Sequence, residues 1–243
     1  MKKDLKSYAE HDKDYQGQFG IESFRKAKTD YDASGMFEKD GFKKAIDMTP
    51  VRKLHIDIGS GGGWLLFKTS PFFEKVIGVE PSKTACDNVS ILIKEYETHN
   101  VELINSDMID AIKNLHLQTP AFFTTVIVLS HIKDFYVKEF LQLLNTIPEN
   151  STLYFCERYD KNMQQNLWHI RRKYWWAKNL SEWHLEFFDI EANGYKSGIF
   201  GKKIGNANIT NTFTPTIKEN ILWLIDGIKQ KILRVFRFIK RSI

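Results

Sequence analysis

Cysteine and proline are scarce in this sequence. Its 243 residues include two cysteines, Cys86 and Cys156, and six prolines. Each cysteine lies in an apolar stretch, which argues against a disulfide framework or a cysteine metal site and favours core positions in a reducing compartment. With 42% hydrophobic and 27% charged residues, the composition is typical of a globular chain and excludes a low-complexity one.

Long hydrophobic runs are also missing. No stretch reaches the roughly 18 apolar residues needed to cross a bilayer, and the first twenty residues hold no apolar signal-peptide core. We therefore expect a cytoplasmic protein. The seven histidines show neither metal-ligand spacing nor a His-Glu-x-x-His motif, so we expect no metal.

Positive charge is concentrated at one end of the chain. The formal net charge is +5, but residues 229–243 contain six cationic residues and no acid, which leaves −1 for the remainder. A nearly neutral body argues against a broad phosphate-binding surface, and no RNA-binding module is recognisable. Nucleic acid is therefore disfavoured as a partner.

The length and texture of the chain predict one α/β domain with appendages. Residues 1–50 are polar and dotted with aromatics, which indicates an N-terminal cap or lid. Residues 51–206 form the expected main domain. Residues 217–243 have apolar side chains at helical spacing with cations between them, which predicts a basic amphipathic helix.

Short apolar runs separated by amphipathic segments predict five parallel strands. They span residues 53–58, 75–79, 101–104, 122–129 and 152–156. Segments 82–97 and 135–144 suit the crossover helices, and an aromatic-rich helical stretch covers 162–180.

Two further strand-like runs predict how the sheet ends. Residues 183–190 and 195–204 flank the segment Glu191-Ala192-Asn193-Gly194. Asn-Gly between two such runs is a strong hairpin signal. We therefore expect a parallel α/β sheet, flanked by helices and closed by an antiparallel hairpin.

A glycine-rich turn follows the first predicted strand and opens a helix, where glycines allow a tight turn and close approach to a ligand. The spacing of a dinucleotide-binding turn requires a small residue at position 64, but this chain has Trp64. Asp57, two residues before the first glycine, suits a cationic ligand better than a phosphate. The turn reads Asp57-Ile58-Gly59-Ser60-Gly61-Gly62-Gly63.

This turn resembles the first motif of the class I, Rossmann-like S-adenosylmethionine-dependent methyltransferases, which has the pattern acid-x-Gly-x-Gly-x-Gly. Glu80, at the end of the second strand, matches the carboxylate that accepts both ribose hydroxyls in that family. Asp107 matches the contact to the adenine amino group, with Met108 beside the ring, although Asp107 also suits an ordinary helix N-cap. The resemblance covers about residues 50–204 and implies S-adenosylmethionine as cofactor. The residues it assigns to the cofactor are Asp57, Gly59, Ser60, Gly61, Gly63, Glu80, Pro81, Asp107, Met108 and Ser130.

The fourth predicted strand leads into Leu129-Ser130-His131-Ile132-Lys133-Asp134. Its carboxyl end should face the ligand edge of the sheet. The segment is similar to the Leu-x-His-hydrophobic-x-Asp stretch of many small-molecule methyltransferases. His131 is thus either a general base for a hydroxyl acceptor or a residue that lines the pocket.

Two further groups could contact an acceptor. The first, Glu157, Arg158 and Tyr159, ends the fifth strand and reads equally well as the solvated start of a helix. The second is aromatic and suits either stacking on an acceptor ring or a plain hydrophobic core. It comprises Trp168, Tyr174, Trp175, Trp176 and Trp183.

These features predict a methyltransferase that acts on a small-molecule or glycan-precursor hydroxyl. The basic segment 217–243 suits an anionic membrane surface, a partner protein or the chain's own domain. An enzyme of bacterial surface-polysaccharide synthesis, peripheral on the inner membrane face, would combine these properties. A lipid or quinone methyltransferase is the enzymatic alternative, and a non-catalytic interaction module is the alternative from another class.

Overall fold

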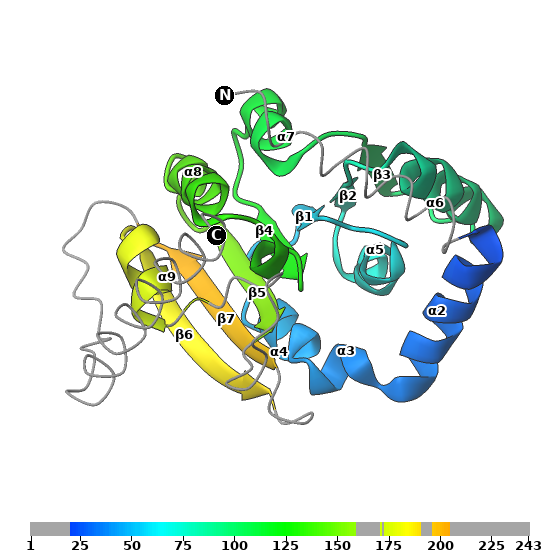
Figure 1. Ribbon diagram of the computed structural model, residues 1–243, viewed down its shortest axis with the longest axis horizontal. Coiled ribbons are helices and arrows are strands. Elements are labelled where there is room, and N and C mark those ends of the chain that lie inside the picture. Colours follow the sequence, from blue (N-terminus) through cyan, green and yellow to red (C-terminus); the bar gives the residue numbers. More distant parts are fainter. Residues whose placement is uncertain (1–19, 159–170, 172, 191–195, 205–243) are drawn as a thin grey trace, which may run out of the picture.

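The computed structural model describes residues 20–158, 171, 173–190 and 196–204. Seven strands form one sheet in the order β3-β2-β1-β4-β5-β7-β6 (Figure 1). Their bounds are β1 Leu54–Ile58, β2 Lys75–Val79, β3 Val101–Ile104, β4 Phe122–Val126, β5 Thr152–Arg158, β6 Trp183–Ile190 and β7 Lys196–Lys203.

The pairing confirms the predicted sheet. Strands β1 to β5 pair in parallel, and β7 lies antiparallel between β5 and β6. The turn at Asn193-Gly194 lies outside the described residues. Two predicted boundaries are wrong: the fourth strand ends at Val126 rather than at residue 129. The fifth continues to Arg158 instead of stopping at residue 156.

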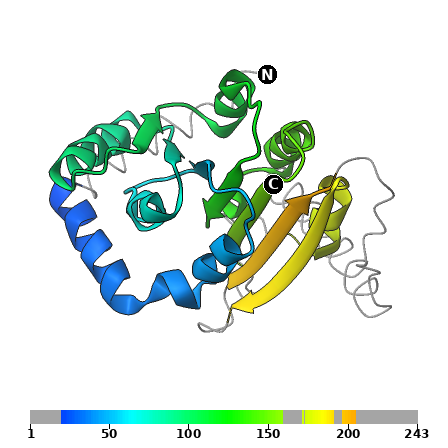
Figure 2. The ribbon, with the colours of Figure 1, turned by 180° about the vertical axis from the view of Figure 1, so that it is seen from behind.

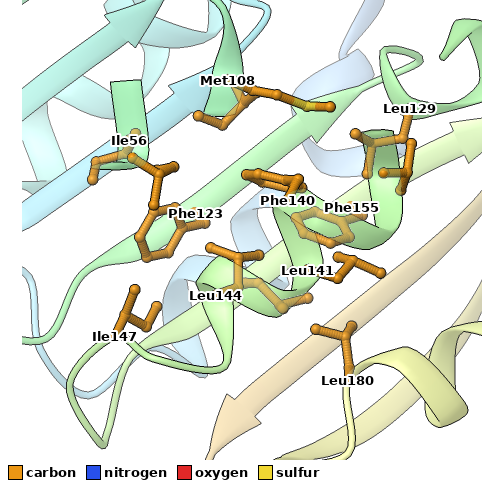
Figure 3. Close-up of a cluster of buried hydrophobic side chains, with 14 of the residues drawn as sticks. Ile56, Met108, Phe123, Leu129, Phe140, Leu141, Leu144, Ile147, Phe155 and Leu180 are labelled. Atoms are coloured by element: carbon orange, nitrogen blue, oxygen red, sulfur yellow. The ribbon is translucent and has the colours of Figure 1, made fainter. Parts of the chain in front are cut away.

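One face of the sheet packs against the helices α7 (Met108–Leu115), α8 (Asp134–Leu144) and α9 (Lys173–Asn179). Alternate strand residues such as Ile56, Phe123 and Phe155 meet the apolar faces of these helices, as Figure 3 shows. A continuous apolar core fills this layer because every second side chain of a strand points to the same side.

The other face is covered by α2 (Ile21–Ser34), α3 (Met36–Lys39), α4 (Phe42–Asp47), α5 (Trp64–Thr69) and α6 (Lys83–Glu95). Figures 1 and 2 show α2, α3 and α4 running in an arc around α5, from α6 toward β5. Phe24, Phe37 and Phe42 from this arc are buried in the same core as residues of α5 and α6. The N-terminal helices therefore contribute to the core of the domain.

Trp64 attaches the arc of α2, α3 and α4 to α5. Its ring stacks on Tyr31 of α2 at a centroid distance of 4.6 Å and meets the edge of Phe42 of α4 at 5.8 Å. The bulky residue at the start of α5 thus packs outward onto the N-terminal helices. Offset and edge-to-face aromatic contacts of this kind add roughly 0.5–1.5 kcal/mol each beyond area burial.

Tyr154, a buried residue of β5, joins the arc to the sheet. Its ring lies edge-on to Phe42 at 5.1 Å, and its hydroxyl donates to the carbonyl of Asp40 at 2.5 Å. Burial raises the pKa of this phenol well above its usual range. A Cβ on Gly198 of β7 would lie 2.3 Å from the hydroxyl oxygen, so glycine is required where β7 passes the phenol.

Candidate functional site

The glycine-rich turn between β1 and α5 is fixed by backbone hydrogen bonds. Gly59 and Ser60 donate to the carbonyl of Val79 at 2.7 and 3.1 Å, and Gly63 donates to the carbonyl of Ser60 at 2.9 Å. Gly59, Gly61 and Gly63 have φ values of +71°, +50° and +75°. Glycine adopts this left-handed region without the steric penalty of other residues, so the turn depends on its composition.

Neighbouring side chains approach the turn closely. A Cβ on Gly59 would lie 2.5 Å from Cγ2 of Val128, and one on Gly63 would lie 2.7 Å from Cγ1 of Val89 in α6. Phe24 of α2 lies against Gly62, at 3.2 Å from a Cβ placed there. The turn therefore meets the loop after β4, the helix α6 and the N-terminal arc.

Glu80 directly follows β2 and is 5% exposed. Its Oε2 accepts from the backbone N–H of Gly61 at 2.9 Å, and its Oε1 accepts from that of Ser82 at 2.9 Å. The carboxylate thus links the ends of β1 and β2. A carboxylate has capacity for about four hydrogen bonds, so it can also accept from a ligand's hydroxyls.

Asp57, the second-to-last residue of β1, is 3% exposed. Its Oδ1 accepts from the hydroxyl of Thr124 on β4 at 2.6 Å. Burial raises the pKa of Asp57 to about 7, Glu80 adds to the rise by charge repulsion, and the Thr124 hydrogen bond opposes it. Two buried acids at adjacent strand ends favour a ligand that brings positive charge.

Asp107 and Met108 lie at the next strand end. Oδ1 of Asp107 accepts from the backbone N–H groups of Ile109 and Asp110 at 2.8 and 3.0 Å, which caps α7. Its Oδ2 makes no hydrogen bond to the described part of the chain. Met108 is buried, and Figure 3 shows its side chain in the core among Ile56 and Phe140. Pro81 and Asn105 meet nearby, because the Asn105 amide donates to the Pro81 carbonyl at 3.0 Å.

Two buried serine hydroxyls flank the site. The Oγ atoms of Ser60, in the glycine-rich turn, and of Ser130, after β4, have no hydrogen-bond partner among the described residues. A buried hydroxyl without a partner costs about 1–3 kcal/mol. Both atoms are suited to a polar ligand at the carboxyl edge of the sheet.

The loop after β4 departs from the predicted strand. Ile127 has a φ of +58° while its N–H donates to Cys156 at 2.8 Å, so the chain turns out of the sheet there. A β-branched residue rarely adopts this region, and such outliers concentrate at functional sites. A short 3-10 helix, η2 (Leu129–His131), follows and carries the exposed His131.

The solvated start of a helix, one of the two alternatives for Glu157, is wrong because Glu157 is buried within β5. The side chain is 4% exposed and accepts from the hydroxyl of Thr125 at 2.8 Å. It also accepts from the backbone N–H groups of Leu129 and Ser130 at 3.2 and 3.0 Å. Burial raises its pKa. Because β5 carries it inward beneath η2, Glu157 holds the loop.

Arg171 holds the same loop from the other side. Its guanidinium donates to the carbonyls of Leu129 and Ile132 at 2.5 Å each and to Oδ1 of Asp134 at 2.9 Å. It also lies over the ring of Trp175, 5.0 Å from the centroid. Both the N–H and the carbonyl of Leu129 are therefore bound to buried charged groups, which fixes the loop that carries His131.

The remaining residues proposed to contact an acceptor lie in different environments. Trp176 and Trp183 are buried in the core beneath α8 and β5, which confirms the core alternative for these two. Trp175 packs against that core and is partly buried. Tyr159, Trp168 and the side chains of Arg158 and Tyr174 lie outside the described residues.

The structure therefore brings Asp57, Glu80, the glycine-rich turn and Ser130 to one edge of the sheet, with Asp107 at the next strand end. Sequence reasoning missed Thr124 and Arg171. Thr124 could have been noticed as a hydroxyl within an apolar strand next to Asp57, but Arg171 had no local signal. A groove of about 330 Å³ lies away from this site, at the C-terminal ends of α7 and α8. Its lining residues include Ile112, Leu143 and Ile147. Within the described residues, no three His, Cys, Asp or Glu side chains gather as metal ligands.

The basic segment 217–243 lies outside the described residues. In the part of the chain that the structure does describe, no helix is long and apolar enough to cross a membrane.

Comparison with solved structures places the fold. A S-adenosylmethionine-dependent methyltransferase from Clostridium acetobutylicum is 12% identical, with a TM-score of 0.55 over 70% of this chain and 92% of that one. One from Aquifex aeolicus is 13% identical, with a TM-score of 0.55 over 77% and 100%.

A third similar structure is a geranyl diphosphate C-methyltransferase from Streptomyces coelicolor, in complex with Mg²⁺, geranyl diphosphate and S-adenosyl-L-homocysteine. It is 10% identical, with a TM-score of 0.52 over 67% of this chain and 77% of that one. Compared by sequence, the chain matches no protein-family model and no curated protein. The chain therefore has the Rossmann-like fold of class I methyltransferases.

Proposed function

We propose that this protein is a S-adenosylmethionine-dependent methyltransferase. The observation that carries the proposal is the pair of buried acids, Asp57 and Glu80, at adjacent strand ends with the Gly61 amide bound to Glu80. Burying two carboxylates, of which Glu80 raises the pKa of Asp57, is costly unless a ligand compensates for it. An interaction scaffold has no need of either acid.

The residues present suit this cofactor. Glu80 would accept the ribose hydroxyls, Asp57 would face the positively charged methionine end, and Asp107 would accept from the adenine amino group. The two buried hydroxyls without partners, on Ser60 and Ser130, would supply further polar contacts. The turn glycines would admit the ligand close to the backbone.

When bound, S-adenosylmethionine supplies an electrophilic methyl group on a sulfonium, which is transferred by in-line displacement. The chain's own contribution is positioning, because alignment of acceptor and methyl provides most of the rate enhancement in such reactions. Glu80 and Asp57 orient the cofactor. The loop held by Glu157 and Arg171 sets the position of Ser130 and His131 beside it.

Calorimetric titration tests cofactor binding. We expect the wild type to bind S-adenosylmethionine and S-adenosylhomocysteine with a Kd below about 100 μM, within the usual range for substrates. Glu80→Gln should weaken binding at least about tenfold, because an amide cannot accept from two backbone N–H groups and a ribose together.

The matched control is Glu102→Gln on β3, where an exposed glutamate pairs with Lys75 at 2.8 Å. It should leave the Kd unchanged, since surface ion pairs contribute little. Absence of any binding by the wild type, or equal binding by Glu80→Gln, would contradict the proposal.

For the acceptor, we propose a hydroxyl of a small molecule or glycan precursor, with His131 as the general base. Support comes from the exposure of His131 at the carboxyl edge and from the two buried charged groups that fix its loop. A base whose ordinary pKa lies near neutrality is suited to removing a hydroxyl proton as the methyl is transferred.

Replacement of His131 by Gln tests this role. Turnover of an oxygen acceptor should fall by about 100-fold or more, while the affinity for S-adenosylhomocysteine should stay within about threefold. His99→Gln, an exposed histidine between α6 and β3, is the control and should be silent. If the turnover of His131→Gln stays within threefold of wild type, His131 is not the general base.

The basic segment 217–243 supports a location at an anionic membrane, as in bacterial surface-polysaccharide synthesis, with a lipid or quinone acceptor as the alternative. In liposome flotation, full-length protein should float with anionic vesicles more than a chain ending at Thr216, because cations and apolar residues alternate along the segment. Equal flotation would leave a partner protein or the chain's own domain as the binding surface.

A further inference from the structure

His55 is a buried histidine that the proposed chemistry does not use. It lies on β1 two residues before Asp57, on the same face of the sheet, and is fully buried. The rings of Phe73 and Phe122 each lie 5.3 Å from its ring and stack on each other at 5.6 Å. Burial lowers its pKa to about 3, so the imidazole is neutral at pH 7, with one nitrogen donating and the other accepting.

Both ring nitrogens bind threonine hydroxyls. Nδ1 lies 2.8 Å from Oγ1 of Thr69, in the last turn of α5, and Nε2 lies 2.8 Å from Oγ1 of Thr124 on β4. Thr124 is also the residue that donates to Oδ1 of Asp57 at 2.6 Å. Four side chains thus form one continuous row from α5 to the candidate site.

The direction of this row follows from counting protons. When Asp57 is ionised, the single hydroxyl proton of Thr124 goes to its carboxylate, so Nε2 of His55 must be the donor toward Thr124. Nδ1 must then accept, and it takes the proton of Thr69. The Thr69 hydroxyl also donates to the Leu65 carbonyl at 2.8 Å, so Nδ1 and this carbonyl share its proton in a three-centre hydrogen bond.

We propose that His55 is a positioning residue for Asp57. Through Thr124, its Nε2–H tautomer directs a hydroxyl proton at Oδ1, which orients the carboxylate and favours its charged form. The inference rests on the proposed function, because the charge so stabilised serves the positive end of S-adenosylmethionine.

The groups around Asp57 make the proposal specific. From β2 it faces Glu80, which raises its pKa, and from β4 it faces Thr124, which lowers it. Its own strand contributes His55 and α5 contributes Thr69, both neutral. Among the described residues, the row of hydroxyls and imidazole is therefore what favours ionised Asp57, and it opposes burial and Glu80.

The first experiment needs neither a variant nor a ligand. Nitrogen-15 NMR of the wild-type imidazoles, at a pH about one to two units above the pKa of Asp57, should find His55 as the neutral Nε2–H tautomer. The Nδ1–H tautomer, or a charged imidazolium, would overturn the proposal.

The second experiment follows the affinity for S-adenosylmethionine against pH. Binding should strengthen as pH rises through the pKa of Asp57. In His55→Leu the midpoint should move up by about half a unit or more, because Thr124 loses the donor that orders it. In His55→Gln, whose amide nitrogen reaches about as far as Nε2, the midpoint should stay near that of wild type.

A structural role alone would lower stability in both variants without separating their midpoints. Equal midpoints in wild type and His55→Leu would therefore overturn the proposal. If the wild type fails to bind S-adenosylmethionine at all, the proposed function fails, while the NMR result still decides the tautomer of His55.

Discussion

Gly59 carries two constraints at once. Its φ of +71° lies in the left-handed region, and the space beside its Cα is filled by Val128, 2.5 Å from where a Cβ would stand. The first constraint is local to the turn. The second depends on the loop after β4, so the two can be separated by mutation.

Gly59→Ala should destabilise the protein by about 2–4 kcal/mol, the sum of a left-handed alanine and a clash within a packed site. Adding Val128→Ala should remove the clash but not the backbone penalty, which gives a coupling energy of about 1 kcal/mol or more in a double-mutant cycle. Urea unfolding measures all three variants.

Gly20→Ala is the matched control, because nothing lies within 4 Å of a Cβ at Gly20 and its φ is negative. It should cost no more than about 1 kcal/mol. Strict additivity of Gly59→Ala and Val128→Ala would contradict the contact.

At the scale of single residues, the sequence predicts those whose role depends on their neighbours in the chain. The glycines and Glu80 sit in the turn and at the strand end where their spacing puts them, because both depend on nearest neighbours in the chain. The role of His55 depends on which residue of β4 stands across from β1. Asp57 pairs with Thr124 in the register of these strands, and a single sequence does not fix that pairing.

Among the elements, the loop between β4 and α8 is held by two buried charged side chains. Glu157 binds two of its N–H groups, and Arg171 binds two of its carbonyls and Asp134. The buried charges compensate each other only in part, since burial raises the pKa of Glu157 and lowers that of Arg171. Their hydrogen bonds to the loop supply the rest.

Arg171→Lys should loosen this loop while keeping the charge, because an ammonium cannot reproduce the planar fork that reaches two carbonyls and a carboxylate. The amides of Leu129 and Ser130 should exchange with deuterium at least about tenfold faster, which corresponds to a loss of about 1.4 kcal/mol in local stability. Amides of β1 should change less.

Arg25→Lys serves as the control. This arginine pairs with Glu95 at the surface of α2, and the variant should leave exchange at Leu129 unchanged. Equal exchange rates in Arg171→Lys and wild type would show that Glu157 alone holds the loop.

Element boundaries were predictable where periodicity and caps agree. Asp107 begins α7 and Ser82 begins α6, each by accepting a backbone N–H. The end of β4 was not predictable, because Val126-Ile127-Val128-Leu129 is uniformly apolar and the turn at Ile127 uses a backbone conformation that its residue type disfavours. The loop imposes that conformation from Glu157 and Arg171, which are distant in sequence.

For the whole molecule, His55 and Asp57 have opposite effects on stability as pH changes. The folded pKa of His55, about 3, lies below its ordinary value, so its contribution is complete above pH 6.5 and is lost as pH falls toward 3. The folded pKa of Asp57, about 7, lies above its ordinary value, so stability is lost as pH rises from 3.8 to 7.

Between about pH 4 and 6.5 these two dependences should oppose each other in the wild type. Relative to wild type, His55→Leu should lose stability as pH rises through this window, and Asp57→Asn should gain it. Comparison with wild type removes the contribution of Glu157, which acts in the same direction as Asp57. Urea unfolding from pH 4 to 8 provides the measurement. If the stability of both variants depends on pH in the same way as that of wild type, both pKa shifts are refuted.

The contact between Tyr154 and Asp40 has a consequence for how the chain folds during synthesis. Phe24, Phe37 and Phe42 leave the ribosome long before Tyr154, and β7, which seals that phenol with Gly198, follows later still. Until then the N-terminal helices cannot complete their burial, and contacts so distant in sequence form slowly. These helices, made before the strands that bury them, are therefore among the last parts to be secured, and they present exposed aromatic rings to chaperones in the interval.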